Sequence, residues 1–206
     1  MILHKSTPNY VIYDDFFNEE ELSKIWNEVL FLTSPSKMLP PEKSGSAIDN
    51  NGKILKKNSA IFLENIYADR LTSDINVLTD KVFSREIFDQ LNSIGGVFNY
   101  IKVTNRNYNF LSYYEDSDYY RPHLDYSVFT MLIWLSKEPK KFEGGDLIFD
   151  DINETIDFKS NRLIIFPSFL FHSVTPVKMV GDYKPYGGEG RYTITKFLTV
   201  NPIKSE

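Results

Sequence analysis

The stretch YYRPHLDYSVFTMLIWLS, residues 119–136, joins a polar and aromatic segment to a run that is almost wholly apolar. His123 and Asp125 stand two residues apart where the polar part ends, and the chain contains only 3 histidines. In an extended strand, side chains at positions i and i+2 point to the same face of the sheet. We therefore expect this imidazole and this carboxylate to share one metal ion.

Short segments rich in Val, Ile, Phe, Tyr and Thr surround this stretch from about residue 97 onward, and turn residues separate them. They are FNYIKVT (98–104), YNFLSYYE (108–115), SVFTMLIWLS (127–136), GDLIFDD (145–151), ETIDFK (154–159), RLIIFP (162–167), HSVTPVK (172–178) and RYTITKFLTV (191–200). Many short strands at even spacing are typical of an all-β sandwich or barrel.

The part of the chain before residue 97 predicts helices. YVIYDDFF (10–17) predicts a short strand that runs into a turn. In the segment after it, Asn18 and Glu21 stand at the spacing of a capping box and predict the start of a helix. Apolar residues at helical spacing mark the face that this helix should bury. They are Leu22, Ile25, Trp26, Val29 and Leu30.

Two further segments complete this half. Residues 33–58 are rich in Ser, Pro, Lys, Asn and Gly and predict a long excursion with little regular structure. Residues 72–94 predict a second amphipathic helix, or a broken pair of helices, that ends at Gly95 and Gly96.

The composition excludes several classes of site. The net charge is −5, which argues against a nucleic-acid partner because phosphate binding needs a basic surface. The chain has no cysteine, so it has no disulfide, zinc–thiolate site or thiol nucleophile. MILHKSTPNY (1–10) lacks the apolar core of a signal peptide, and no apolar run reaches the length of a membrane span. We expect a cytoplasmic protein with no membrane partner.

Two more residues extend the metal site. His172 follows the apolar segment RLIIF and its Pro167 turn, and Arg191 begins the last predicted strand. Two histidines and one carboxylate form the facial triad of non-haem Fe(II) oxygenases, which leaves coordination positions open for other ligands. An arginine in the same barrel can hold a carboxylate with two parallel hydrogen bonds.

In this order the motifs resemble those of the Fe(II)- and 2-oxoglutarate-dependent dioxygenases, specifically the prolyl 4-hydroxylase-like branch. YYEDSDYYRPHLDY (113–126) is similar to that branch's tyrosine, short turn and Y-x-P-H-x-D pattern. TMLIWLS, FEGGDLIF, RLIIFPSFLFHSV and GRYTITKFL continue the likeness over about residues 97–200. The HxD pattern alone is weak, but the ordered set is specific.

The resemblance implies a mainly β fold with supporting α-helices, in which a double-stranded β-helix (jelly-roll) core packs against N-terminal helices. It implies a single domain over residues 1–206. In this domain, residues 1–96 would form a helical support with a long loop, and residues 97–206 would form the jelly-roll catalytic core.

The resemblance also implies the roles of single residues. His123, Asp125 and His172 would bind Fe(II), and Arg191 would pair with the far carboxylate of 2-oxoglutarate. Four further residues would bind that cosubstrate or line its pocket, and they are Tyr114, Thr195, Trp134 and Leu132. Trp134 stands where relatives often carry a tyrosine.

Two features depart from the family pattern. Collagen-type members use lysine where this chain has Arg191, and Lys178 is the alternative anchor here. The gap between His172 and Arg191 is longer than in relatives, and the insertion at residues 181–190 could form a flap over the site.

The implied reaction consumes 2-oxoglutarate and O2, hydroxylates a C–H bond, and releases succinate and CO2. Procollagen-proline 4-dioxygenases are the type that the motifs resemble, so the expected substrate is a peptide or protein that contains proline. Ascorbate dependence is expected from the family. The alternatives are a hydroxylase of a free amino acid or other small metabolite, and a non-catalytic jelly-roll binding protein. Repair of alkylated nucleobases is disfavoured because acidic residues outnumber basic ones, 28 to 23.

Overall fold

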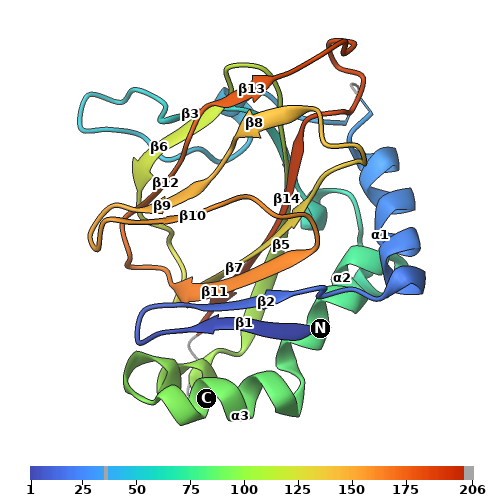
Figure 1. Ribbon diagram of the computed structural model, residues 1–206. Helices are drawn as coiled ribbons and strands as arrows, with labels where there is room; N and C mark the ends of the chain where they lie inside the picture. The colour runs from blue at the N-terminus through green and yellow to red at the C-terminus, as the bar shows by residue number, and fades with distance from the viewer. Residues whose placement is uncertain (35–36, 202–206) are drawn as a thin grey trace.

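The computed structural model describes residues 1–34 and 37–201, and its strands form two main antiparallel sheets (Figure 1). The strand order of the seven-stranded sheet is β1 (Ile2–Ser6), β2 (Val11–Asp14), β11 (Arg162–Pro167), β7 (Phe129–Leu135), β14 (Arg191–Thr199), β5 (Arg106–Tyr114) and β4 (Ser59–Phe62). The order of the five-stranded sheet is β10 (Glu154–Ile156), β9 (Leu147–Phe149), β12 (His172–Val174), β6 (Tyr119–His123) and β3 (Lys56–Lys57). A separate pair consists of β13 (Val177–Met179) and β8 (Phe142–Gly144). The predicted jelly-roll core is confirmed.

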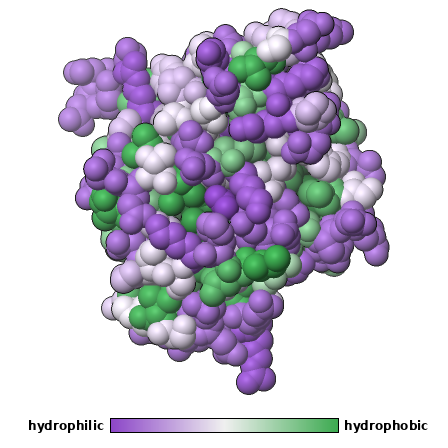
Figure 2. Space-filling view, in the orientation of Figure 1, coloured by the Kyte–Doolittle hydropathy of each residue, from purple (hydrophilic) through white to green (hydrophobic). Residues whose placement is uncertain are grey.

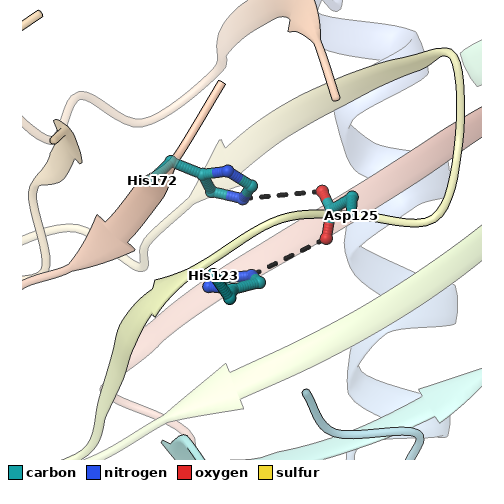
Figure 3. Close-up of side chains that lie close together, drawn as sticks. All are labelled: His123, Asp125 and His172. Atoms are coloured by element: carbon teal, nitrogen blue, oxygen red, sulfur yellow. Dashed lines mark ion pairs between the residues drawn. The ribbon is translucent and has the colours of Figure 1, made fainter. Parts of the chain in front are cut away.

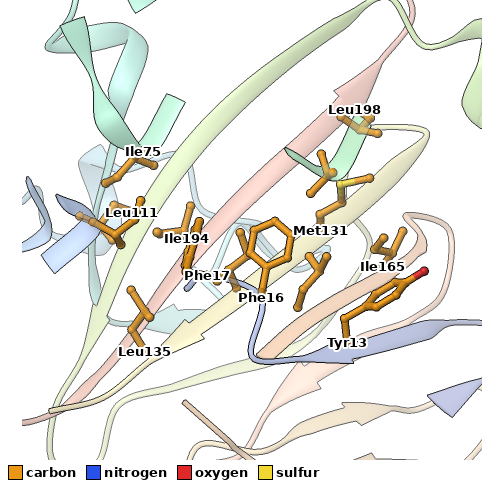
Figure 4. Packing of buried hydrophobic residues seen from close by; sticks show 14 of the residues in the cluster. Tyr13, Phe16, Phe17, Ile75, Leu111, Met131, Leu135, Ile165, Ile194 and Leu198 are labelled. Atoms are coloured by element: carbon orange, nitrogen blue, oxygen red, sulfur yellow. The ribbon is translucent and has the colours of Figure 1, made fainter. Parts of the chain in front are cut away.

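Helices cover the outer face of the larger sheet (Figure 1). The α-helices are α1 (Glu19–Leu32), α2 (Asp74–Thr79) and α3 (Arg85–Ile94). The 3₁₀ helices are η1 (Pro41–Lys43), η2 (Leu63–Asn65), η3 (Arg70–Thr72), η4 (Asp80–Phe83) and η5 (Gly96–Val103). The apolar side chains between helices and sheet form the main hydrophobic core, part of which Figure 4 shows around Ile75, Leu111 and Ile194.

Strand β7 explains why residues 129–135 form a continuous apolar run in the sequence. All seven of its residues are buried, because helices cover one face of the strand and the barrel interior lies on the other. Met131 and Ile133 belong to the main core, whereas Leu132 and Trp134 belong to a second apolar cluster that faces the smaller sheet. Buried strands lack the alternation that half-exposed strands display.

The predicted start of the first helix is confirmed. The Asn18 side chain accepts a hydrogen bond from the Glu21 backbone N–H, and the Glu21 carboxylate accepts one from the Asn18 N–H. The predicted buried face needs one correction. Leu30 is 46% exposed, and Leu32 is fully buried in its place. Of the two readings of residues 72–94, the broken pair is confirmed, since α2, η4 and α3 follow one another.

One prediction of local structure is wrong, and one strand was not predicted. FNYIKVT (98–104) lies mostly in η5 and not in a strand; its buried residues Phe98 and Ile101 are three apart, the period of a 3₁₀ helix. Strand β1 has no counterpart in the sequence-based prediction, because all five of its residues are exposed and so show no periodic pattern.

The excursion at residues 33–58 has little regular structure, as predicted. Outside residues 35–36, which lie beyond the described part, it contains only η1, β3 and isolated bridges such as Ile48 with Ile54. Among residues 1–34 and 37–201, no helix is long and apolar enough to cross a membrane. The face of the molecule in Figure 2 is mostly hydrophilic and carries small, separate hydrophobic patches.

Candidate metal and carboxylate site

Three potential metal ligands converge inside the barrel (Figure 3). His123 ends β6 and His172 begins β12, and these residues pair directly across the two strands. Asp125 Oδ1 lies 3.6 Å from His123 Nε2, and its Oδ2 lies 3.5 Å from His172 Nε2. One ligand atom from each of the three residues lies within 4.8 Å of the others, so one metal ion can contact all three.

The structural reason for this convergence differs from the expected one. Strand β6 ends at His123, so Asp125 is not on the same extended strand, and the period-two argument is wrong for this pair. Asp125 lies in the turn after β6, where its N–H donates to Ser168 O at 3.3 Å. Its carboxylate accepts a hydrogen bond from Thr130 at 2.6 Å. Tertiary contacts therefore place the acid beside the imidazoles.

Backbone carbonyls orient both imidazole rings. His123 Nδ1 lies 2.8 Å from Arg121 O, and His172 Nδ1 lies 2.8 Å from Leu170 O. Since a carbonyl only accepts, each Nδ1 carries the proton and each Nε2 keeps its lone pair toward Asp125. Burial and the neighbouring His172 lower the pKa of His123 to about 4, so that ring is neutral at pH 7, as metal binding requires.

Arg191 lies in the same cavity and is 1% exposed. Its Nη1 donates to Thr193 Oγ1, whereas Nε and Nη2 have no hydrogen-bond partner in the described structure. Burial lowers the pKa of Arg191 to about 10, so the guanidinium stays charged at pH 7. A buried cation with unused N–H donors is stable only if an anion pairs with it. The site therefore fits a carboxylate ligand.

Aromatic rings enclose this guanidinium. Arg191 Cζ lies 4.8 Å from the ring of Tyr114, 5.2 Å from that of Trp134 and 5.6 Å from that of Phe158. Such contacts between a cation and ring faces are favourable and hold the planar fork in one orientation. The indole N–H of Trp134 is buried without a partner, so it is a further unused donor near Arg191.

The inner cavity contains the triad and Arg191 together, and most predicted cosubstrate residues line it. Its wall includes Tyr114, Leu132 and Thr195. Trp134 is fully buried and is not among the residues that line the wall, and its ring lies beside Arg191. Lys178, the alternative anchor, is an exposed residue 3.7 Å from Glu143, so it does not compete with Arg191 for the buried position.

Sequence reasoning missed two contributors to this cavity. Phe158 reaches the Arg191 cage from the connection between β10 and β11, and no local motif marks it. Gly145 leaves room for Arg191, since a Cβ at position 145 would lie 2.6 Å from Arg191 Cδ. Gly144 and Gly145 are visible in the FEGGDLIF motif, but nothing in the sequence indicates that Gly145 lies against Arg191.

An outer cavity of about 580 Å³ adjoins the inner one and shares Asp125 and Tyr120 with it. Aromatic rings dominate its wall, and they belong to Phe62, Tyr108, Tyr120, Tyr126 and Phe197. Backbone and side chains of residues 45–47 close one side. The long excursion therefore lines the approach to the triad.

The insertion at residues 181–190 lies elsewhere. It contributes to neither cavity wall within the described structure. Tyr186 and Gly188 instead border a small separate pocket beside Tyr113 and Tyr192, on the opposite face of β5 and β14. The possibility of a flap over the site is not supported by this position.

Comparisons with known proteins agree with this geometry. The sequence model of the 2OG-Fe(II) oxygenase superfamily matches residues 108–199. No curated protein matches the chain.

Several solved structures are similar to this chain. A Pseudomonas putida prolyl-4-hydroxylase has a TM-score of 0.62 and 14% identity, with 94% of each chain covered. The viral collagen prolyl hydroxylase of Paramecium Bursaria Chlorella virus-1 has a TM-score of 0.55 and 15% identity, over 93% of this chain and 97% of that one. An oxidoreductase of the 2OG-Fe(II) oxygenase family from Burkholderia pseudomallei has a TM-score of 0.54 and 12% identity, over 93% of this chain and 85% of that one.

At such identities the structures show a shared fold, and the match over residues 108–199 is a second, independent likeness in sequence. This matched segment contains all three residues of the triad and Arg191. Over residues 108–199 the chain is thus similar to the 2OG-Fe(II) oxygenase superfamily, and its fold is that of the solved structures above.

Proposed function

We propose that this chain is an Fe(II)- and 2-oxoglutarate-dependent hydroxylase that acts on a prolyl residue in a peptide or protein and releases succinate and CO2. The observation that carries the proposal is the buried Arg191, whose unused N–H donors face the same cavity as the His123, Asp125 and His172 triad. A keto-acid that reaches the metal at one end needs a cation at its other end.

The residues present fit both groups. His123, Asp125 and His172 would hold Fe(II) through two imidazoles and one carboxylate, a set that suits this ion. Arg191 would bind the far carboxylate of 2-oxoglutarate, with Tyr114, Thr195 and Trp134 as further donors beside it and Leu132 as an apolar wall. When bound, these groups and O2 supply an oxidant able to convert a C–H bond to C–OH.

The protein's own contribution is orientation and exclusion of water. Two backbone carbonyls hold the imidazole tautomers, so each Nε2 atom points its lone pair toward the metal position. The aromatic cage holds the guanidinium where a carboxylate can accept two parallel hydrogen bonds. The apolar wall of the inner cavity keeps bulk water from the reacting centre, which strengthens these contacts.

The outer cavity supports a polypeptide substrate. Its size, its aromatic wall and its opening beside Asp125 suit an extended chain that presents a prolyl ring to the triad. Tyr120 and Tyr126 can contact such a ring, whereas Tyr119 faces a different surface groove. Two similar solved structures are described as prolyl hydroxylases, which favours the same substrate class.

Two further expectations belong to this proposal. A single domain over residues 1–206 is supported by the larger sheet, which joins β1, β2 and β4 to strands from the second half of the chain. Ascorbate would act as an accessory reductant during turnover.

The cofactor part of the proposal is tested by anaerobic titration with Fe(II) and 2-oxoglutarate. We expect a metal-to-ligand charge-transfer band in the wild type that is lost in H123A and retained in H4A, the matched control outside the cavity. Absence of the band from folded wild-type protein would refute the enzyme and favour a jelly-roll binding protein.

The substrate part is tested separately with a library of proline-containing peptides, read by succinate release and by a mass gain of one oxygen atom. Iron-dependent hydroxylation of a prolyl residue supports the proposal. Turnover of a free amino acid or another small metabolite, with no peptide product, would reassign the same site to a small-molecule hydroxylase.

A further inference from the structure

Thr130 makes the closest side-chain contact to the acid of the triad. It lies in β7 and is fully buried, and its Oγ1 donates to Asp125 Oδ2 at 2.6 Å. A hydrogen bond from a hydroxyl to a carboxylate is among the stronger classes in proteins. Because Oδ2 accepts this bond and Oδ1 accepts none in the described structure, Oδ1 keeps both of its lone pairs for an ion.

Asp125 depends on this contact more than a strand residue would. Strand β6 ends at His123, so no sheet ladder holds the backbone of Asp125. Its N–H reaches Ser168 O only at 3.3 Å. In the described structure, Thr130 is the only side-chain donor that hydrogen-bonds to the Asp125 carboxylate. Rotation of the carboxylate is therefore limited chiefly by Thr130.

Two serine hydroxyls extend the contact. Ser168 Oγ lies 2.9 Å from Thr130 Oγ1, and Ser127 Oγ lies 2.6 Å from Ser168 Oγ. Each hydroxyl can donate once and accept as well, so the bonds can run in one direction from Ser127 through Ser168 and Thr130 to Asp125. Ser127 Oγ also lies 3.2 Å from Phe129 O, a weaker alternative acceptor. Such chains strengthen each bond by polarisation.

The hydroxyl chain joins the two segments that carry the ligands. Ser127 follows Asp125 in the turn after β6, and Ser168 lies in the turn that leads from β11 to His172. Thr130 stands between them on β7 of the larger sheet, which is buried on both faces. These linked hydroxyls thus connect Asp125 and the turn before His172 to the same buried strand, β7, which fixes the distance between the two ligands.

We propose that Thr130 is a positioning residue for Asp125, and that Ser168 acts through Thr130 to hold the carboxylate with Oδ1 toward the metal position. The proposal rests on the function proposed above, because it concerns the iron held by the triad. Substitution of a residue that hydrogen-bonds to a metal ligand typically weakens metal binding by about 10- to 100-fold.

The test measures metal affinity without turnover. Anaerobic calorimetric titration with Fe(II), and with Mn(II) as a redox-stable probe, is carried out on wild type, T130V, T130S, S168A and the surface control T155V. Valine keeps the shape of threonine and removes the hydroxyl, and Thr155 lies on the exposed side of β10. We expect T130V to bind about 10- to 100-fold more weakly, T130S within about 3-fold of wild type, and T155V unchanged.

A double variant separates positioning from simple packing. If Ser168 acts through Thr130, T130V/S168A binds metal no more weakly than T130V, because effects within one network are not additive. Additive losses, or T130V with wild-type affinity and a wild-type melting temperature, would overturn the proposal. If T130V does not fold, S168A provides the test. We expect S168A to bind metal about 3- to 10-fold more weakly than wild type, and an unchanged metal affinity would refute the proposal. Wild-type protein that binds no metal would refute the proposed function itself.

Discussion

Gly145 and Arg191 approach each other so closely that a methyl group at position 145 would lie 2.6 Å from Arg191 Cδ and 3.2 Å from its Nε. The glycine that precedes β9 therefore makes room for the buried guanidinium. This relationship connects two motifs that are far apart in the sequence, the GG turn and the RYTIT strand.

The variant G145A is expected to displace Arg191 and to raise the KM for 2-oxoglutarate by about 10-fold or more, since one mispositioned bidentate contact is worth roughly 1.4 kcal/mol or more. Gly145 has φ +72, so alanine also strains the backbone. The variant G52A supplies the control, because Gly52 has φ +76 and no atom within 4 Å of the added Cβ. Equal effects of both variants on KM would show that strain, and not displacement of Arg191, is responsible.

The charge and the shape of Arg191 can be separated by substitution. We expect R191M to raise the KM for 2-oxoglutarate about 100-fold or more and R191K about 10-fold, because lysine keeps the charge and loses the bidentate fork. The measurement is the dependence of succinate release on 2-oxoglutarate concentration. K178A should leave the KM for 2-oxoglutarate unchanged. If this KM rises in K178A and stays at the wild-type value in R191M, Lys178 and not Arg191 binds the carboxylate.

Trp134 offers an unused indole N–H beside the Arg191 cage. W134F keeps an aromatic ring and removes the donor, so we expect the Kd for 2-oxoglutarate to rise about 3- to 10-fold if that donor binds the carboxylate. The chain has 2 Trp residues, so W26F leaves Trp134 as the sole indole. Anaerobic titration of W26F with 2-oxoglutarate should then change its fluorescence. An unchanged signal together with an unchanged Kd in W134F would exclude the contact.

Glu115 fastens the insertion to the outer face of the sheet. Its carboxylate oxygens accept the Tyr186 N–H at 2.7 and 2.9 Å, and one of them accepts the Tyr113 hydroxyl at 2.9 Å. Tyr186 has φ 58, a backbone conformation that needs such support.

Because the bond to a buried carboxylate is lost, E115A should lower the free energy of unfolding by about 1–3 kcal/mol and expose residues 181–190 to limited proteolysis. E189Q removes only a partly exposed ion pair with Lys141 and should cost less than about 1 kcal/mol. Resistance of the insertion to proteolysis in E115A would show that other contacts hold it.

Lys56 is a buried cation for which the described part of the chain supplies no ion-pair partner. Its Nζ donates to Ser44 O at 3.2 Å and lies 4.8 Å from the ring centre of Phe110. Burial lowers its pKa from 10.5 to about 8. Because the charged form is disfavoured in the folded state, K56M should increase the free energy of unfolding at pH 7 by roughly 1–3 kcal/mol.

The pH dependence of this effect has a defined sign. Between pH 8 and 10.5 the unfolded chain binds more protons at Lys56 than the folded chain does, so the stability of wild type rises with pH in that window. The advantage of K56M should therefore be largest below pH 8 and shrink above it. Urea unfolding at pH 7 and pH 10 provides the measurement, with the exposed K57M as control; an advantage that grows with pH would contradict the assignment.

Much of the site could be predicted from the sequence. His123, Asp125, His172 and Arg191 stand in an order and context that a random chain seldom produces, and the structure brings all four to one cavity. The resemblance also implied Tyr114, Thr195 and Leu132, and the structure places all three in the wall of that cavity. The capping box of α1 was equally predictable, since it depends on two residues three apart.

Other features depended on contacts between distant segments. FNYIKVT has a strand-like composition, yet it forms η5, since propensity is weak beside the packing of Phe98 and Ile101 into the core. Strand β1 has no buried face and gains its place only by pairing with β2. The insertion at 181–190 could not be located from its composition, because Glu115 holds it on the face opposite the cavity.

The sequence by itself determined the types of the candidate metal ligands and, through the resemblance, the jelly-roll class, because these depend on the chemical identity of the residues and on the order of the motifs. Only the tertiary structure decided that Asp125 reaches the imidazoles from a turn, that Thr130 and Ser168 hold its carboxylate, and that Gly145 makes space for Arg191. These relationships join residues on different strands, and the distance between such residues is set by the close packing of the two sheets.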